Sequence, residues 1–333
     1  MQKNRKSLGY LSNMLSIFLT FVMVILILYL LYFLYNNLPR SPENLDVKIG
    51  GQENFSQIIT ETHQFHPNMK FNHNDISYMI SSDCDLTKKQ RMHEAFNILS
   101  QTVNSISFHE ASSISEPIDI EVSCSGSNKL APSTGSKKDF FVAGEGGATE
   151  IVESGKYNII TNGTVLLFKY PKNSLECSYP NIELHELIHV FGFDHSQDKN
   201  SLMNPYISSC DQKLDISIIN ELKRLYSVEN LPDLAFENIK AVKKGRYLDF
   251  NLTIKNIGLT DTGNVTLSVF DDNELVETSD VGDIKYGAGV IIKIENFKLI
   301  HLNPKQITFK IDNANNIKEL DKSNNIAQVN FNN

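Results

Sequence analysis

The chain has 333 residues, which is enough for two domains of ordinary size. Hydrophobic residues make up 41% and charged residues 21%, a globular rather than a disordered composition. The formal net charge of −8 argues against a nucleic-acid partner, which would favour a basic face.

Residues 11–35 form an apolar stretch without a single charged residue. As a helix with a rise of about 1.5 Å per residue, this stretch crosses a hydrocarbon core of about 30 Å with some length left for tilt. A cleaved signal peptide is the alternative. Its apolar run would be only about 7–15 residues long, however, and no small-residue cleavage site follows here. We therefore expect a transmembrane anchor that makes the membrane a partner of residues 11–35.

The orientation of this anchor follows from the basic residues that precede it, which are Lys3, Arg5 and Lys6. The positive-inside rule keeps residues 1–10 in the cytoplasm as a short tail and sends everything after the anchor outside. Residues 36–65 are polar and mixed, and we expect them to form a stalk. The predicted location is the cell membrane, with a single pass and with the folded domains extracellular.

The four cysteines lie beyond the anchor, at Cys84, Cys124, Cys177 and Cys210. An even number of cysteines fits an oxidising exterior, where disulfides persist. Four cysteines allow three connectivities, and their count alone does not choose between them. No C-x-x-C pair is present, which argues against a cysteine zinc site.

A structured region with mixed periodicity follows the stalk. Six apolar side chains recur at helical spacing within residues 87–106 and predict a helix there. Alternating or buried apolar runs predict strands in four places, the third of which runs into a glycine turn: 75–81, 118–124, 140–149 and 164–170. The order of strand, helix and further strands predicts an α/β layer fold.

The stretch "LHELIHVFGFDH" (184–195) holds three of the nine histidines. Its apolar residues recur at i, i+3, i+4 and i+7 and predict a helix with one buried face. His185 and His189 lie one turn apart on the opposite face, where two imidazoles can bind one Zn²⁺. Gly192 can take the left-handed conformation that ends the helix, so that His195 arrives from the turn as a third ligand.

Three protein ligands leave the fourth zinc position to water, which is typical of a catalytic site. The alternative is a helix whose histidines merely face solvent or core. The pattern H-E-x-x-H-x-x-G-x-x-H fixes five positions, and a chance match in a chain of this length is on the order of one in ten thousand. The remaining histidines show no such pattern, and we expect ordinary surface or hydrogen-bonding roles for them: His63, His66, His73, His93, His109 and His301.

The same stretch, followed by "SLMNPY" (201–206), resembles the metzincin zinc peptidases and, within them, the matrixins. The resemblance covers residues 66–228 and includes "MKFNHNDISYMI" (69–80) as a first strand and "DISIINELKRLY" (215–226) as a last helix. It implies that Met203 is the Met-turn residue. Asn204 departs from the pattern, because matrixins usually have a tyrosine there.

The resemblance also implies a function. One catalytic Zn²⁺ would be held by the three histidines, and Glu186 would act as general base and then as general acid on a peptide or protein substrate. Pro205 and Tyr206 would form a wall of the pocket beside the cut. An extended substrate would add as a strand to a nearby edge, for which we choose residues 139–144.

The positions of the cysteines now favour one pairing. Cys177 lies shortly before the zinc-binding helix and Cys210 shortly after the Met turn, so we predict a bond between them. Cys84 and Cys124 then pair with each other from strand ends on either side of the first helix.

Residues 229–333 contain seven short alternating strands separated by Gly, Asn and Asp turns, which predicts an all-β, Ig-like sandwich. "NIGLTDTGNVTL" and "IDNANNIKELDKSNN" resemble the CARDB modules of prokaryotic surface proteins. The module is expected to position the peptidase or to dock a cell-surface partner. A Ca²⁺ site at Asp312, Asn316 and Glu319 is considered, but their spacing does not match an EF-hand loop.

We therefore expect an α/β (α+β) metzincin-like domain and an all-β sandwich behind a transmembrane helix. The predicted function is that of a membrane-anchored, outward-facing zinc endopeptidase. The alternative is a surface adhesion protein with an inactive peptidase-like scaffold. The presence of Glu186 beside all three histidines favours the enzyme.

Overall fold

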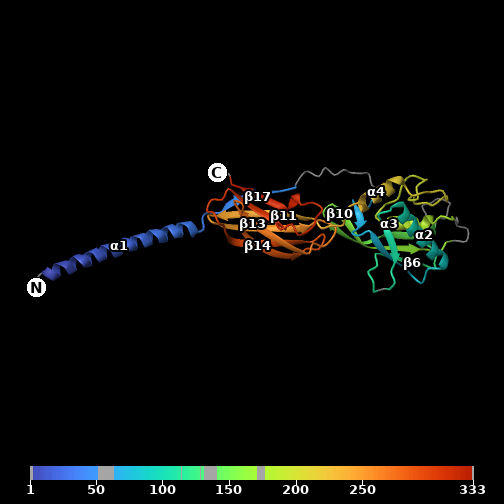
Figure 1. The fold of residues 1–333 in the computed structure, drawn as a ribbon. Coiled ribbons are helices and arrows are strands. Elements are labelled where there is room, and N and C mark those ends of the chain that lie inside the picture. The colour runs from blue at the N-terminus through green and yellow to red at the C-terminus, as the bar shows by residue number, and fades with distance from the viewer. Residues whose placement is uncertain are drawn as a thin grey trace.

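A computed structural model describes residues 3–51, 64–113, 115–127, 129–130, 141–170 and 177–331. Helix α1 (Lys3–Asn37) extends from one end, a β-sandwich lies in the middle, and a mixed α/β domain lies at the far end (Figure 1). Residues Asn13–Asn37 of α1 are long and apolar enough to cross a membrane. A signal sequence near an N-terminus meets the same description, so α1 is an apolar helix that fits either a membrane anchor or a signal sequence.

The mixed domain is built on one sheet with the order β3-β10-β6-β4-β5. Strand β10 is central: its first half pairs with β3, its second half pairs with β6, and β9 runs antiparallel along its other side. The strands are β3 (Met69–Phe71), β4 (Asp75–Ile80), β5 (Ser107–Glu110), β6 (Ile120–Cys124), β9 (Gly144–Ser154) and β10 (Tyr157–Leu167). A separate pair is formed by β7 (Lys129–Leu130) and β8 (Phe141–Val142).

Three helices pack on this sheet, namely α2 (Leu86–Thr102), α3 (Asn181–Val190) and α4 (Ile216–Tyr226). Helix α2 begins at Asp85, whose side chain accepts a hydrogen bond from the Lys88 amide. The predicted helix over 87–106 is wrong at its end. The chain leaves helical geometry at Val103, whose φ is −118°, and Val103 and Ile106 reach the core from the turn that follows.

The predicted glycine turn after residue 140 is also wrong, because Gly146 and Gly147 lie within strand β9. Helix α3 packs directly on this strand. A Cβ at Gly146 would lie 2.1 Å from the main-chain oxygen of Glu186, and a Cβ at Gly163 on β10 would lie 2.4 Å from Cγ1 of Val190. The glycines therefore allow α3 to lie closer to the sheet than any side chain would permit.

Two disulfides join elements of the mixed domain. Cys84 is bonded to Cys124, and Cys177 is bonded to Cys210. The second bond links the entrance of α3 to the loop that precedes α4. Among the described residues no cysteine is free.

The seven strands expected after residue 229 are present and form a sandwich of two sheets. The strands are β11 (Leu234–Lys244), β12 (Tyr247–Asn256), β13 (Asn264–Asp271), β14 (Glu274–Asp283), β15 (Gly289–Lys298), β16 (Gln306–Ile311) and β17 (Ile326–Asn330). Their inward-facing side chains form a hydrophobic core of their own, separate from that of the mixed domain. The expected combination of a mixed α/β domain and a β-sandwich is confirmed.

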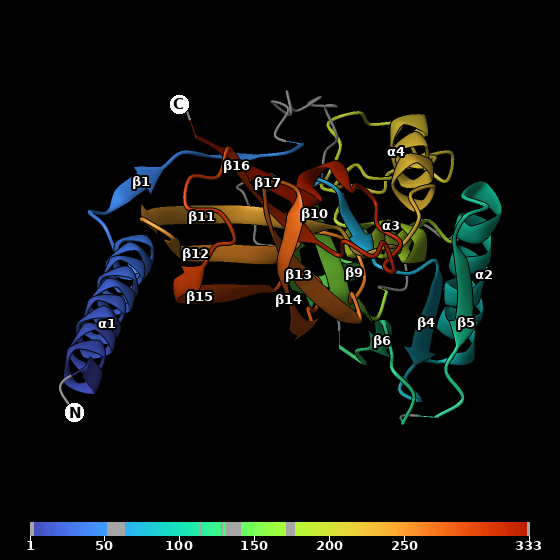
Figure 2. The same ribbon diagram turned by 60° about the vertical axis from the view of Figure 1, so that its left-hand side comes forward.

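The segment after α1 is not a simple stalk. Strand β1 (Glu43–Leu45) pairs with β11, and β2 (Val47–Ile49) pairs with β17. The two short strands therefore extend both sheets of the sandwich at the same edge, and Figure 2 shows β1 beside β11, just after α1. The remainder of the expected stalk, residues 52–63, lies outside the described part of the chain.

The added strand β2 offers a matched pair of substitutions. Val47 is partly buried against the sandwich core, whereas the neighbouring Lys48 is exposed. Val47→Asp should lower the free energy of unfolding of the fragment 41–333 by about 1–2 kcal/mol, because a charge replaces an apolar contact. Lys48→Asp should leave it within about 0.5 kcal/mol. Urea unfolding of both variants checks this, and equal effects would contradict the strand addition.

The packing of α3 on β9 can be tested with a second matched pair of substitutions. Gly146→Ala forces the strand and helix apart and should destabilise the fragment 41–333 by about 1–3 kcal/mol. A Cβ at Gly147 meets nothing within 4 Å, so Gly147→Ala should have little effect. Thermal unfolding of the two variants measures the difference. If Gly146→Ala is as stable as Gly147→Ala, the close approach of α3 is not a requirement of the fold.

Candidate metal centre

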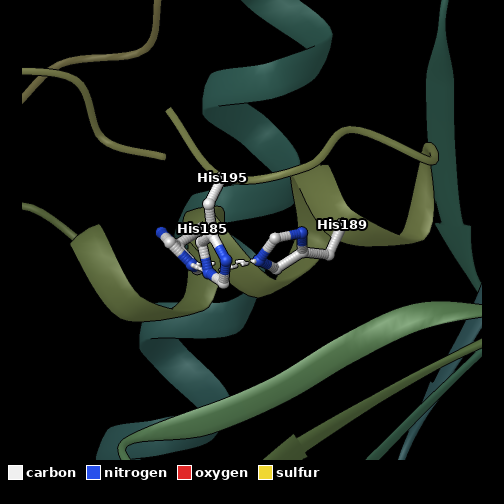
Figure 3. A group of neighbouring side chains, drawn as sticks. All are labelled: His185, His189 and His195. Carbon is white, nitrogen blue, oxygen red and sulfur yellow. Dashed lines mark hydrogen bonds between the residues drawn. The ribbon is translucent and has the colours of Figure 1, made fainter. Parts of the chain in front are cut away.

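Three imidazole rings converge at the C-terminal half of α3. His185 and His189 lie on the helix one turn apart, and His195 reaches the same point from the loop after the helix (Figure 3). Gly192 makes that loop possible, since its φ is +84° and a Cβ there would lie 2.3 Å from Sδ of Met69. The expected left-handed glycine and the expected grouping of the histidines are confirmed.

The distances between the rings fit a metal ion. The Nε2 atoms of the three histidines lie 3.1, 3.2 and 3.3 Å from one another. A tetrahedral Zn²⁺ with Zn–N bonds of about 2.0–2.1 Å separates its nitrogens by about 3.3–3.4 Å. The donor set therefore suits zinc without rearrangement.

The opposite ring nitrogens determine the tautomers. Nδ1 of His185 lies 2.7 Å from the main-chain oxygen of Leu202, and Nδ1 of His189 lies 2.6 Å from that of Phe193. A carbonyl oxygen only accepts, so each Nδ1 carries the proton and donates it. Each Nε2 is then unprotonated, and its lone pair points at the place where the three rings meet. Hydrogen bonds from Nδ1 to carbonyl oxygens commonly orient metal-binding histidines in this way.

The surroundings also keep these ligands neutral. Burial, and to a lesser extent the neighbouring His189, lowers the pKa of His185 to about 3. Burial likewise lowers the pKa of His189 below its usual value. A metal ligand must offer a free lone pair, so histidines that resist protonation are ready to bind a cation at neutral pH.

Glu186 lies between the two helical histidines in sequence, and its side chain faces strand β9. A Cβ on Gly144 would lie 2.6 Å from Cγ of Glu186 and 2.9 Å from its Oε1, so this glycine leaves room for the carboxyl group. Burial raises the pKa of Glu186 to about 8, and Glu145 adds to the shift, while a hydrogen bond from the Gly146 amide acts against it. A cation bound at the histidines would also lower this pKa.

A buried ion pair that no sequence pattern indicated fixes the start of α3. Glu183 is fully buried, and its Oε1 accepts hydrogen bonds from Nε of Arg91 at 3.0 Å and from the hydroxyl of Tyr170 at 3.2 Å. Arg91, on α2, also donates to the main-chain oxygens of Cys177 and Tyr179. One guanidinium therefore joins α2, α3 and the disulfide-bonded entrance of α3.

The residues after His195 form a tight loop. Met203 is fully buried, and its main-chain oxygen accepts from the Ser196 amide. Asn204, the departure from the matrixin pattern, donates through Nδ2 to the main-chain oxygens of Ser196 and Asp198, each at 3.2 Å. Its amide thus joins the two arms of the loop.

The outer part of this loop is exposed. Pro205 lies at the surface, and Tyr206 is 52% exposed. Both follow directly on Asn204, whose Oδ1 accepts from the Tyr206 amide.

The expected substrate edge is only partly described. Residues 139–140 lie outside the described residues, Phe141–Val142 pair with β7, and Gly144 begins β9. Among the described residues β10 is the only strand that pairs with β9, and the Gly144 end of β9 lies against Glu186.

The sandwich holds two further groups of polar residues. At the site considered for Ca²⁺, the ammonium of Lys322 lies 3.3 Å from Asp312 and 3.6 Å from Glu319, so a cation of the chain already faces these carboxylates. Asp271, Asp272 and His301 also lie close together. Their carboxylates accept hydrogen bonds from main-chain amides, including that of His301 at 2.8 Å.

Comparison with models of known protein families identifies both of the expected domains. Residues 70–227 match the model of the matrixin family, and residues 231–329 match that of CARDB. No curated protein matches the chain.

Two similar solved structures each cover about a third of the chain. The CARDB domain of a Pyrococcus furiosus protein, in complex with di-metal ions, is 20% identical with a TM-score of 0.26, over 30% of this chain and 85% of that one. A domain of a Methanosarcina acetivorans protein is 20% identical with a TM-score of 0.25, over 31% and 93%. These likenesses carry no argument about function.

The zinc-ready histidine triad and the family match lie in the same part of the chain. Residues 70–227 are therefore a matrixin domain, of the matrixin zinc metallopeptidase family, and residues 231–329 are a CARDB domain.

Proposed function

We propose that this protein is a membrane-anchored, outward-facing endopeptidase that cleaves peptide bonds at the His185, His189 and His195 site. The observation that carries the proposal is the convergence of the Nε2 atoms of His185, His189 and His195, within 3.3 Å of one another, beside the buried carboxyl group of Glu186. We place the peptidase domain at 66–228, the sandwich at 229–333 and the anchor at 11–35, with residues 1–10 in the cytoplasm.

The three histidines would hold a single zinc ion. When bound, Zn²⁺ supplies a Lewis acid that acidifies water and polarises the scissile carbonyl. The fourth coordination position of the zinc would remain available for water or substrate, because all three protein ligands come from one short stretch and leave one side open. An open position of this kind suits a catalytic site. His195 is the most exposed of the three, with 42% of its side chain accessible, so the open side is the side that faces solvent.

Glu186 is proposed as the general base. Its carboxyl group accepts the proton of the attacking water and then gives it to the leaving amine, so that both products leave neutral at the reacting atoms. The environment supports this role: burial raises the pKa of Glu186, whereas the Gly146 amide and a cation bound at the three histidines both lower it and favour the ionised form that accepts a proton.

Strand β9 is proposed as the edge on which an extended substrate lies. Its free edge offers main-chain donors and acceptors, and its Gly144 end adjoins Glu186. We propose Met203 as the Met-turn residue, and Pro205 and Tyr206 as the wall of the pocket for the side chain after the cut. Their position in the loop that follows His195 supports this assignment.

The membrane anchor is proposed from the character of α1. None of its most apolar window is buried inside the protein, so lipid would cover side chains that the folded domains leave exposed. The two disulfides are consistent with a secreted or membrane-anchored protein, because such bonds persist outside the cytosol.

The metal and the base are tested separately. His185→Ala, His189→Ala or His195→Ala should each remove most of the zinc measured by mass spectrometry of the purified protein. Glu186→Gln should keep the zinc and lower kcat on peptides by about 10²–10⁴-fold. His109→Ala, which changes an exposed histidine outside the site, is the control and should alter neither. Full activity of Glu186→Gln would disprove the role of the base, and zinc retained by the three alanine variants would disprove the site.

The topology has its own test. Protease added to intact cells should remove the domains after residue 40, whereas an epitope placed before residue 11 should stay protected until the membrane is opened. A mature protein that is found only in the medium and begins near residue 40 would show that α1 is a cleaved signal peptide.

A further inference from the structure

Strand β9 touches both domains. At one end, Gly144 and Gly146 lie against Glu186 of the metal centre. At the other end, Ser154 enters the CARDB domain. The ten steps between Gly144 and Ser154 correspond to about 33 Å, so a single strand spans the distance from the site to the domain boundary.

The hydroxyl group of Ser154 forms its hydrogen bonds with the sandwich and not with its own domain. It is 1% exposed, and its hydroxyl donates to the main-chain oxygen of Gly258 at 2.6 Å, with that of Asn256 at 3.3 Å. The hydroxyl oxygen accepts from the Gly287 amide at 3.0 Å. The side chain thus binds main-chain groups at the end of β12 and in the turn before β15, where the Gly287 amide also donates to the main-chain oxygen of Asn256.

The backbone around Ser154 fits the sandwich closely. A Cβ at Gly287 would lie 2.6 Å from the main-chain oxygen of Glu153. A small apolar cluster lies beside this contact, in which Tyr157 and Ile159 of β10 pack against Leu259 of the sandwich. The turn between β9 and β10 is therefore held by hydrogen bonds and by apolar packing, and Figure 1 shows β10 at the junction of the two domains.

Strand β9 needs such a support. Among the described residues β9 pairs with β10 only, and its other edge is the one proposed to receive substrate. An edge strand that is paired on one side moves more easily than a central strand. A substrate that binds by strand addition requires the receiving strand to hold a fixed shape.

We propose that the CARDB domain positions the substrate-binding strand β9, with Ser154 as the positioning residue. The domain then takes part in catalysis without touching the substrate. This inference rests on the proposed peptidase function and adds a role for the second domain to it.

The first test compares two buried hydroxyls in the full-length protein in detergent. Ser154→Ala removes the hydroxyl that joins the domains. Ser268→Ala is the matched control, because Ser268 is also 1% exposed but bonds to Thr278 within the sandwich. Ser154→Ala should raise KM for an extended peptide about three- to tenfold while kcat and zinc content stay unchanged, since one hydrogen-bonded anchor is lost. Ser268→Ala should leave KM unchanged.

The second measurement does not depend on activity. Hydrogen exchange followed by mass spectrometry should show faster exchange of β9 amides in Ser154→Ala than in Ser268→Ala. Leu259→Ala changes the contact from the sandwich side and should have the same effect, which covers the case in which Ser154→Ala does not fold.

The outcomes separate the two proposals. Unchanged exchange in β9 and unchanged KM, in both Ser154→Ala and Leu259→Ala, would overturn the positioning role even if the wild-type enzyme is fully active. A wild-type protein that cleaves no peptide would overturn the proposed function, whereas the exchange of β9 would still decide whether the CARDB domain holds the strand.

Discussion

Three ring nitrogens within 3.3 Å of one another are the constraint on which the rest of the mixed domain depends. Three nitrogen lone pairs that point at one another do not attract, so other contacts of the fold must hold the rings in this position. Main-chain oxygens fix the rotation of two rings, the left-handed Gly192 returns the chain to the site, and the glycines of β9 allow α3 to approach. The buried Arg91–Glu183 pair sets the start of the same helix.

The two domains are more closely joined than their order along the chain indicates. The segment 43–49, which precedes the matrixin domain, pairs with the CARDB domain that follows it. The β9–β10 turn of the matrixin domain enters the sandwich from the other side through Ser154. The sandwich therefore lies between α1 and the metal centre (Figure 1), and it contacts both the segment after α1 and the Ser154 end of β9.

The local features could be predicted because each depends on a short stretch of chain. The spacing of His185, His189 and His195 around Gly192 is such a pattern, and so is the alternation of the seven sandwich strands. The contacts made across the sequence could not be predicted in this way. Segment 43–49 is too short to indicate that it pairs with β11 and β17, which lie about 200 and about 280 residues later in the chain. The glycines of β9 indicated a turn, because the sequence around them does not show that helix α3 packs on this strand. Nothing near Ser154 indicates its distant partners.

The most direct test of the account is anomalous diffraction at the zinc absorption edge from crystals of the protein purified without chelators. The account predicts one strong peak at about 2.0–2.1 Å from Nε2 of each of His185, His189 and His195. A peak only at Asp271, Asp272 and His301, or no peak at the three histidines in zinc-supplemented crystals, would contradict it.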